Sequence, residues 1–244
     1  MSRLPTLETP TYTMKIPSSG KKVRYRPFLT KEEKILLIAF ETGNEEDLIT
    51  AVKTLISNCT FGEVDPSTLA KFDIEYMFLH IRAKSVGEIC EPVVVLDDEN
   101  GKKHEIKLKI NIEDIEVYTD PNHTKDIQIQ DNVVIRMKYP TLDTGASLAD
   151  EESGSIDQIF DTIIDCIDQI FFGEQSWNAD DLDRKEIEQF VDSLTKKQFD
   201  MIVDFFRTIP VLRKDIEVTV GEKKHSISIT GLESFFDYAS VTQI

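Results

Sequence analysis

The sequence predicts an α+β protein that is mainly helical, with two or three antiparallel β-hairpins and an extended N-terminal arm. Three observations lead to this fold class. Two helix-start signals, Thr30 with Glu33 and Thr195 with Gln198, each precede a run of apolar residues. An Asn-Gly pair at Asn100 lies between stretches of alternating apolar and polar residues, which is the pattern of a β-hairpin. Four prolines within residues 1–28 disfavour a helix there.

Composition limits the classes of partner. The chain has 244 residues, of which 40% are hydrophobic and 30% charged, so it can form a core. Its 45 acidic and 28 basic side chains give a formal charge of −17, which disfavours nucleic acid and anionic membranes as partners. No apolar stretch is long enough for a membrane span or a signal core. The three cysteines, Cys59, Cys90 and Cys166, are far apart and predict buried thiols in a reducing compartment.

The order of elements predicts four segments. Residues 1–28 form an extended basic arm that ends in a short strand or hairpin. Residues 29–139 hold helices and a β-hairpin unit. Residues 140–155 are small and polar and form a linker, which is the clearest boundary in the sequence. Residues 156–244 hold acidic helices, a C-terminal β-hairpin and a helix.

Helices are predicted in the first half from caps and spacing. The first helix runs from Thr30 to about Gly43, and Asn44 caps a second helix. A third helical segment opens at Asp65-Pro66 and continues through 72–84, since proline is favoured in a first helical turn. Residues 88–138 then change to a two-residue period and are expected to form one small antiparallel sheet.

The second half is predicted to be helical up to Pro210. Ser155 caps a helix that carries apolar residues as far as Phe171. Four acids repeat on another side of this helix at a spacing of three or four: Asp157, Asp161, Asp165 and Asp168. Further helices start at Asp183 or Arg184 and at Thr195.

Charge is unevenly distributed along the chain. The stretch 15–34 carries a net charge of +5, whereas 140–206 carries −13. One interpretation is an ordinary solvated surface. The other is a protein with two faces, which binds two different partners or pairs head to tail with copies of itself.

A short internal echo links two parts of the chain. The stretch 102–108, Lys-Lys-His followed by an alternating strand, is repeated at 223–229, and each copy follows a glycine at or near a turn. The two stretches predict a pair of related helix–hairpin units that pack together or against another chain. Chance similarity of two lysine-rich hairpins is the alternative.

Several motifs of the sequence, taken together, resemble the sequences of one protein family. These are the proline-rich arm with Tyr25-Arg26-Pro27-Phe28, the stretch 31–37, Phe72-Asp73-Ile74-Glu75-Tyr76 with 82–88, and the closing stretch 225–236. In their order they are similar to the baseplate hub and hub-assembly proteins of T-even-like contractile-tailed phages, over most of the chain. The resemblance implies a protein without enzymatic activity, a structural part of the central baseplate hub or a factor that assists its assembly.

The resemblance also implies partners and a place of action. The partners are other hub and tail proteins, in the cytoplasm of the infected host and in the baseplate of the virion tail. The possible pairing with further copies of the chain rests on the charge distribution alone. The residues expected to bind partners lie in the arm and in the two hairpin strands: Arg24, Tyr25, Arg26, Pro27, Phe28, Ile106 and Ile227. Relatives can carry paired cysteines in the hairpins, in a zinc-ribbon-like pattern. Here only Cys90 is near a hairpin, so no metal or other cofactor is expected.

Catalytic alternatives have little support in the sequence. No phosphate-binding loop, dinucleotide fingerprint or nucleophile elbow occurs. A metal site from Cys90 and His104, or a nucleophile pair from Cys59 and His80, would need further ligands or a proximity that the sequence does not give. A cell-wall hydrolase of the tail, using two of the many carboxylates, is the alternative function. The regular spacing of the acids after Ser155 instead indicates a solvated helix face.

Overall fold

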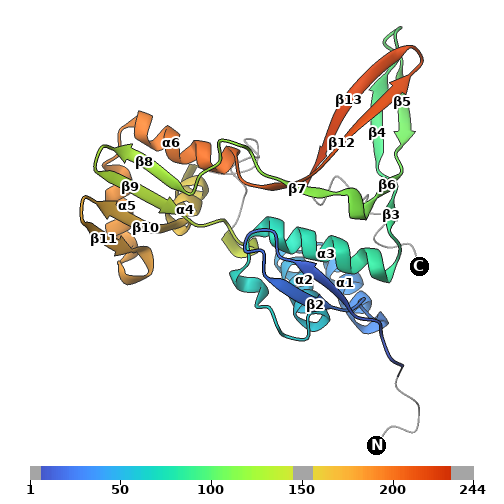
Figure 1. Cartoon of the computed structure of the whole chain (residues 1–244), viewed down its shortest axis with the longest axis horizontal. Helices are drawn as coiled ribbons and strands as arrows, with labels where there is room; N and C mark the ends of the chain where they lie inside the picture. Colours follow the sequence, from blue (N-terminus) through green and yellow to red (C-terminus); the bar gives the residue numbers. More distant parts are fainter. Residues whose placement is uncertain (1–6, 145–155, 232–244) are drawn as a thin grey trace, which may run out of the picture. The chain divides into compact units, whose positions relative to one another are not determined.

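The structure is a computed structural model that describes residues 7–144 and 156–231 (Figure 1). Its contacts divide the chain into two compact units. Unit 1 comprises residues 1–118 and 211–244, and unit 2 comprises residues 119–210. Unit 2 is therefore an insertion in the sequence of unit 1. The four segments predicted from the sequence stay a prediction.

The first part of unit 1 is a hairpin followed by helices. The hairpin pairs β1 (Tyr12–Lys15) with β2 (Lys22–Tyr25) in antiparallel register. The helices are α1 (Thr30–Thr42), α2 (Glu45–Cys59), the short 3-10 helix η1 (Pro66–Thr68) and α3 (Lys71–Ser85). Met14, Ile16, Val23 and Tyr25 are buried, so the hairpin contributes its apolar face to the core.

Helix starts follow the sequence with two differences. Asn44 caps α2 by accepting a hydrogen bond from the Glu46 amide at 3.0 Å, as predicted. At α1, the Glu32 carboxylate accepts from the Leu29 amide at 2.8 Å, so Leu29 and Glu32, not Thr30 and Glu33, close the first turn. The continuous helix predicted from Asp65 was wrong. Leu69 is extended, so η1 ends before α3 begins.

Two hairpins lie side by side in unit 1 (Figure 1). One pairs β4 (Val93–Asp97) with β5 (Lys103–Lys107), and the other pairs β12 (Val211–Val220) with β13 (Lys223–Thr230). The remaining strands of this part are β3 (Ile89–Cys90), β6 (Ile110–Asn111) and β7 (Glu116–Tyr118), with the 3-10 helix η2 (Ile112–Asp114). β3 pairs with β6, and β7 pairs with β12. A shared core that includes Leu79, Ile112 and Leu212 lies beneath them.

Unit 2 is a four-stranded antiparallel sheet packed against helices. Its strands, in the order β11-β10-β9-β8, are β8 (Asp126–Gln130), β9 (Val133–Met137), β10 (Ile167–Phe172) and β11 (Gln175–Asn178). Its helices are α4 (Ile156–Asp165), α5 (Arg184–Asp192) and α6 (Lys196–Arg207), with η3 (Leu142–Thr144) and η4 (Ala179–Asp181). Ile135, Met137, Ile163 and Ile202 are fully buried at the centre of its core. β8 and β11 are the edges of the sheet.

The prediction of a mainly helical fold was wrong, although the α+β class is correct. Helices make up 40% of the described residues and strands 30%. One cause is the stretch 167–172, predicted as helix, which forms β10 instead. Its β-branched and aromatic residues suit a strand, and pairing with both β9 and β11 overrides the helical spacing.

The single sheet predicted for residues 88–138 was also wrong. Its strands are divided among four sheets, two of which include strands from beyond residue 138. Pairing of β7 with β12 and of β9 with β10 joins segments far apart in sequence, which local alternation does not reveal. Within residues 7–144 and 156–231, no helix is long and apolar enough to cross a membrane.

Candidate protein-binding surfaces

The residues predicted to bind partners through the arm are mostly built into unit 1. Tyr25 is only 3% exposed, and Arg26 is buried against Glu32. Arg26 Nη2 lies 3.0 Å from Glu32 Oε1, and Arg26 Nη1 donates to the Pro27 carbonyl at 2.9 Å. Burial alone would raise the pKa of Glu32, but the hydrogen bonds from Arg26 and the Leu29 amide hold that pKa below its usual value. This buried pair fixes the arm to α1.

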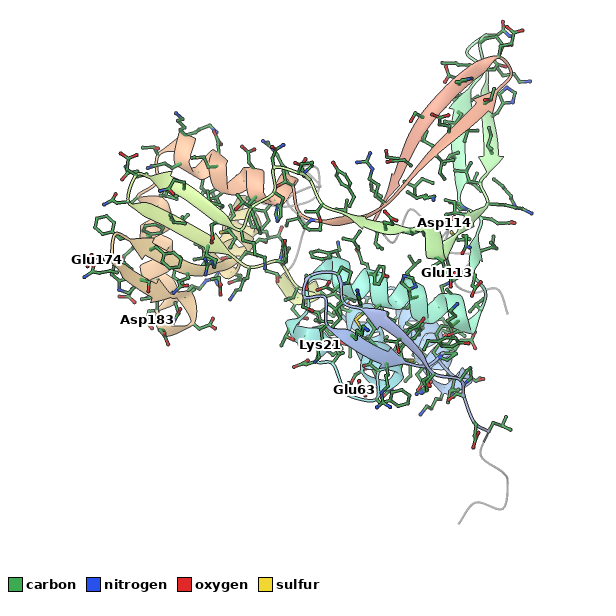
Figure 2. The ribbon with its side chains drawn as sticks, viewed as in Figure 1. Lys21, Glu63, Glu113, Asp114, Glu174 and Asp183 are labelled. Carbon is green, nitrogen blue, oxygen red and sulfur yellow. The ribbon has the colours of Figure 1, made fainter. Side chains whose placement is uncertain are left out.

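Of the five arm residues predicted to bind a partner, Arg24 is the exposed one. Its side chain is 68% exposed, and its Nη2 lies 2.5 Å from Glu63 Oε1. The guanidinium also lies over the ring of Phe61, 5.9 Å from the ring centre. Figure 2 labels Glu63 on this side of unit 1. Of the polar residues predicted in the arm, Arg24 is thus the one placed to meet a partner.

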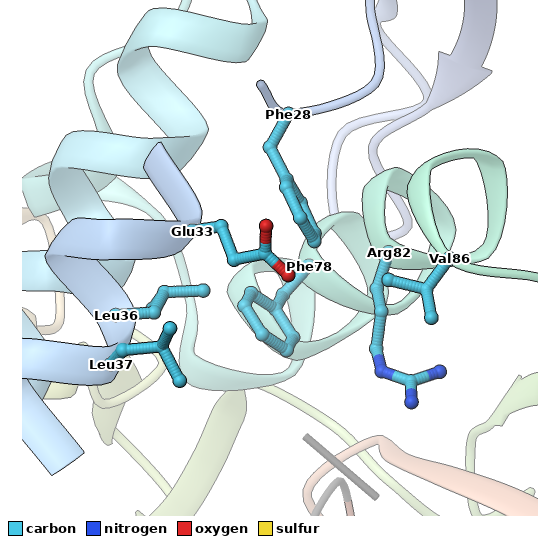
Figure 3. A pocket seen from close by; sticks show the side chains of 7 residues that line it. All are labelled: Phe28, Glu33, Leu36, Leu37, Phe78, Arg82 and Val86. Atoms are coloured by element: carbon cyan, nitrogen blue, oxygen red, sulfur yellow. The ribbon is translucent and has the colours of Figure 1, made fainter. Parts of the chain in front are cut away.

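Phe28 lines a hollow too small for a ligand. The Phe28 amide donates to Ser85 Oγ at 2.9 Å, and its ring reaches toward Phe78 (Figure 3). The hollow between these groups has a volume of about 10 Å³, room for about one water molecule. Leu36, Leu37 and Val86 complete its apolar lining, and Glu33 and Arg82 add two charged side chains. We interpret it as a packing seam between α1 and α3.

The hairpin residues Ile106 and Ile227 face inward. Both are half-buried and pack against the same core under the two hairpins. Ile106 lies opposite Val94 in its hairpin, and Ile227 lies opposite Ile216 in the other. The outward face of β4 instead exposes Val95, which is 57% accessible.

The echoed Lys-Lys-His stretches meet at one turn. Lys223 Nζ lies 2.6 Å from Asp97 Oδ2, and His225 Nε2 lies 2.7 Å from the Asp97 carbonyl oxygen. His104 Nε2 lies 2.9 Å from Asp98 Oδ2, and the Glu222 amide donates to Glu99. The 97–99 segment of the first hairpin therefore contacts both strands that carry the echo. The helix that precedes the second hairpin, α6, belongs to unit 2, so this helix and the second hairpin do not form one compact unit.

The acidic face predicted after Ser155 is partly neutralised within unit 2. Arg184, in the first turn of α5, bridges Asp161 and Asp165 of α4 with 2.5 Å contacts to each. It also lies 3.2 Å from Glu188. Asp168 is on β10 and does not continue the helix face. This cluster joins α4 to α5.

An apolar groove in unit 2 was missed by the sequence reasoning. It has a volume of about 390 Å³ and lies between the end of the sheet and α5. Its lining comes from the sheet and from the segment leading into and along α5: Val133, Ile170, Phe172, Trp177, Leu182, Glu186, Ile187 and Phe190. Phe172 is 50% exposed and Trp177, the single tryptophan of the chain, is 40% exposed. An aromatic residue on each side of the Gly173–Glu174 turn is the signal that points to it.

The groove results from strand register. Phe172 pairs with Val133, and Ile170 pairs with both Ile135 and Trp177, so these side chains share the sheet face that carries the core. Ile135 is fully buried, and Ile170 is buried as well. Toward β11 and the Gly173 turn this face becomes accessible, as the exposed fractions of Phe172 and Trp177 show. The apolar surface therefore continues from the core to solvent.

The thiols and histidines proposed as chemical groups are occupied by packing. Burial raises the pKa of Cys59 to about 12, so the thiol stays protonated although Arg26 Nη1, 3.8 Å from its sulfur, acts in the opposite direction. The His80 ring packs against Tyr76 in a tilted arrangement with the ring centres 4.2 Å apart, and burial lowers the pKa of its imidazole. Cys90 Sγ lies 3.6 Å from the Ile110 carbonyl oxygen, whereas His104 pairs with Asp98. Among the described residues no three Cys, His, Asp or Glu side chains are grouped to hold a metal.

Comparison with known proteins gives two matches. Residues 9–237 match the sequence profile of the family described as T4 bacteriophage base plate protein, which confirms the resemblance drawn from the sequence. The chain is also 25% identical over 232 residues to the "Baseplate hub assembly protein gp26" of Enterobacteria phage T4. That alignment covers 93% of the chain and 98% of the phage T4 protein. No solved structure is significantly similar to the chain.

Proposed function

We propose a function from one premise, that this chain belongs to the T4 bacteriophage base plate protein family, which its match over residues 9–237 establishes. In this proposal the chain acts by binding other proteins of the baseplate hub, as a factor that assists hub assembly. The name of the phage T4 relative, a hub assembly protein similar over nearly its whole length, supports that role. A permanent hub subunit is the second form of the same function.

The observation that best supports a protein-binding role is the open apolar groove of unit 2. Its aromatic lining, Phe172 and Trp177, is of the type enriched where proteins contact each other. Several of the groups that could have supported catalysis have structural partners instead. Cys59 is a protonated, buried thiol, and Asp161 and Asp165 are tied to Arg184. These contacts favour a binding protein over the alternative, a cell-wall hydrolase.

The place of action follows from the same proposal. The chain works in the cytoplasm of the infected host while the hub forms, with other baseplate proteins as its partners. Its three buried cysteines are compatible with a reducing compartment. Its formal charge of −17 disfavours nucleic acid as a partner.

The test is made in infected cells. An affinity-tagged copy should co-purify with hub proteins during assembly, and mass spectrometry of purified virions should then tell the two forms apart. Absence from finished particles supports the assembly factor, whereas a constant copy number supports the hub subunit. Lack of any hub protein among the co-purified chains, together with digestion of purified peptidoglycan by the isolated chain, would overturn the proposal.

A further inference from the structure

The groove of unit 2 lies beside an unpaired strand edge. β11 pairs on one side with β10 and, among the described strands, has no partner on its other side. All four of its residues, Gln175–Asn178, are exposed. A free edge of this kind offers backbone donors and acceptors to another extended chain. Side chains of an added strand would project beside Trp177, on the same face as the groove.

Three carboxylates lie near the groove and this edge. Glu186 lines the groove, Asp183 caps the helix that supplies its wall, and Glu174 lies in the turn next to Phe172. Figure 2 labels Glu174 and Asp183 on the side of unit 2 where β11 lies. No ion pair joins any of these three carboxylates to a basic side chain within the described residues. By contrast, the acids of α4 that face α5 are bridged by Arg184.

The charge of unit 2 decides what kind of occupant fits. Residues 119–210 contain 20 acidic and 8 basic side chains, a formal charge of −12. Two such surfaces repel each other, so a symmetric pair of unit 2 grooves is disfavoured. Phosphate and anionic lipid headgroups are disfavoured for the same reason. Lysine and arginine side chains on a partner would be attracted to the rim, while apolar side chains enter the groove.

We infer that the groove and the β11 edge together bind an extended segment of another baseplate protein, one that carries large apolar side chains and lysine or arginine at every second position, so that both kinds project on the groove face of the sheet. The segment adds a strand to β11 and places an apolar side chain between Phe172 and Phe190. Glu174, Asp183 and Glu186 then pair with its basic side chains. This inference rests on the proposed function only in taking the partner to be a baseplate protein.

The single tryptophan gives a direct measurement. A short synthetic peptide that carries lysine, phenylalanine, lysine and leucine at every second position, with threonine between them, serves as the probe. It is titrated into the full chain while the emission of Trp177 is recorded. Binding should shift this emission to the blue, because the half-exposed indole becomes buried. Added salt should weaken binding, because the rim contacts are between exposed charges. A peptide with glutamate in place of lysine, and one with serine in place of its apolar residues, should not bind.

Two variants and two matched controls locate the site. Phe172→Ala should lower the affinity for the probe peptide by about tenfold or more, which is the effect expected for an aromatic anchor at the centre of an interface. Glu174→Lys should reduce both the affinity and its dependence on salt. Met201→Ala and Asp200→Lys make the same types of change on α6, which contacts β8 at the opposite edge of the sheet, and should leave binding unchanged.

The outcomes separate this inference from the proposed function. Equal binding of the lysine and glutamate peptides, or equal affinity of Phe172→Ala and Met201→Ala, would overturn the groove as the site. So would sedimentation showing that the chain self-associates and that Phe172→Ala makes it monomeric. If Phe172→Ala still co-purifies with hub proteins from infected cells at the wild-type level, the proposed function stands and this inference falls.

Discussion

Two short hairpins of this protein use their apolar residues in opposite ways. The β1–β2 hairpin of unit 1 buries Val23 and Tyr25 against helices. The β10–β11 hairpin of unit 2 leaves Phe172 and Trp177 about half exposed. The apolar content of the two strand pairs is similar, so composition does not decide their role. What differs is how far the inner face of each hairpin is buried in the folded unit.

Charged residues show the same contrast. Next to the first hairpin, Arg26 and Glu32 form a buried ion pair that satisfies both groups inside the fold. Next to the second, Glu174 and Asp183 are exposed and have no basic partner among the described residues. A buried pair is costly to break from either side, whereas exposed carboxylates can change partners. We therefore expect the first hairpin to control stability and the second to control binding.

The largest effect should come from reversing the charge of Arg26. Arg26→Glu places a second carboxylate against the buried Glu32, a change that costs about 3–5 kcal/mol or more. That is a large fraction of the free energy of unfolding of a typical domain, so unit 1 should lose its fold. Arg24→Glu, the same change two positions earlier, affects only exposed contacts, the pair with Glu63 and the contact with Phe61, and should unfold at nearly the wild-type urea concentration.

Urea unfolding followed by circular dichroism compares these two variants. Equal midpoints would mean that Arg26 is not a structural residue and would return it to the set of binding candidates. The comparison also limits the use of the arm in binding studies. Since Arg26→Glu is expected to unfold unit 1, the prediction that the arm binds a partner is tested by Arg24→Glu alone.

A second prediction compares aromatic residues of the two hairpins. Tyr25→Ala should lower the free energy of unfolding by about 3–5 kcal/mol, because it removes a fully packed ring. Phe172→Ala should change the free energy of unfolding by no more than about 0.5 kcal/mol, as for other surface substitutions. The same variant should lower the affinity for the lysine-rich probe peptide. Thermal unfolding measures the first effect and Trp177 emission the second. Equal destabilisation by both changes would show that the groove is part of the core and not a surface for a partner.

The sequence predicted local structure well where caps and turns determine it. Asn44 caps α2, and Asn100-Gly101 lies in the β4–β5 turn, as expected. It failed where pairing is long-range. The stretch 167–172 has a helical apolar period, yet it becomes β10 because β9 and β11 supply hydrogen-bond partners on both sides. No local pattern contains that information.

The candidate site was hard to predict for a related reason. Tyr25 and Arg26 were selected because they are aromatic and basic in a segment expected to be extended. The structure uses both as internal anchors, through burial and the contact with Glu32. The exposure of Trp177 depends on where helical cover of the sheet ends, and that is a property of the packed unit. Sequence supplied the residue types, but their exposure is set by the tertiary structure.

The smallest expected effect is the loss of stability in acid. It tests the buried pair of Arg26 and Glu32 without mutating Arg26. The folded state holds the pKa of Glu32 below its ordinary value of 4.5. A lowered pKa means that the ionised carboxylate stabilises the fold above the unfolded pKa, and that this contribution is lost as the pH falls through the folded pKa. The free energy of unfolding should therefore decrease below about pH 4.5, the unfolded value.

Glu32→Gln isolates this contribution, because glutamine cannot ionise. The wild type should be more stable than the variant near neutral pH, and the two should converge as the pH falls below 4.5. Urea unfolding over a pH series measures the difference. Glu63→Gln is the matched control: its partner Arg24 is exposed, so its difference from wild type should be small at every pH. Parallel wild-type and Glu32→Gln curves would mean that Glu32 does not titrate with folding, and the buried pair would then not be what holds the first hairpin to α1.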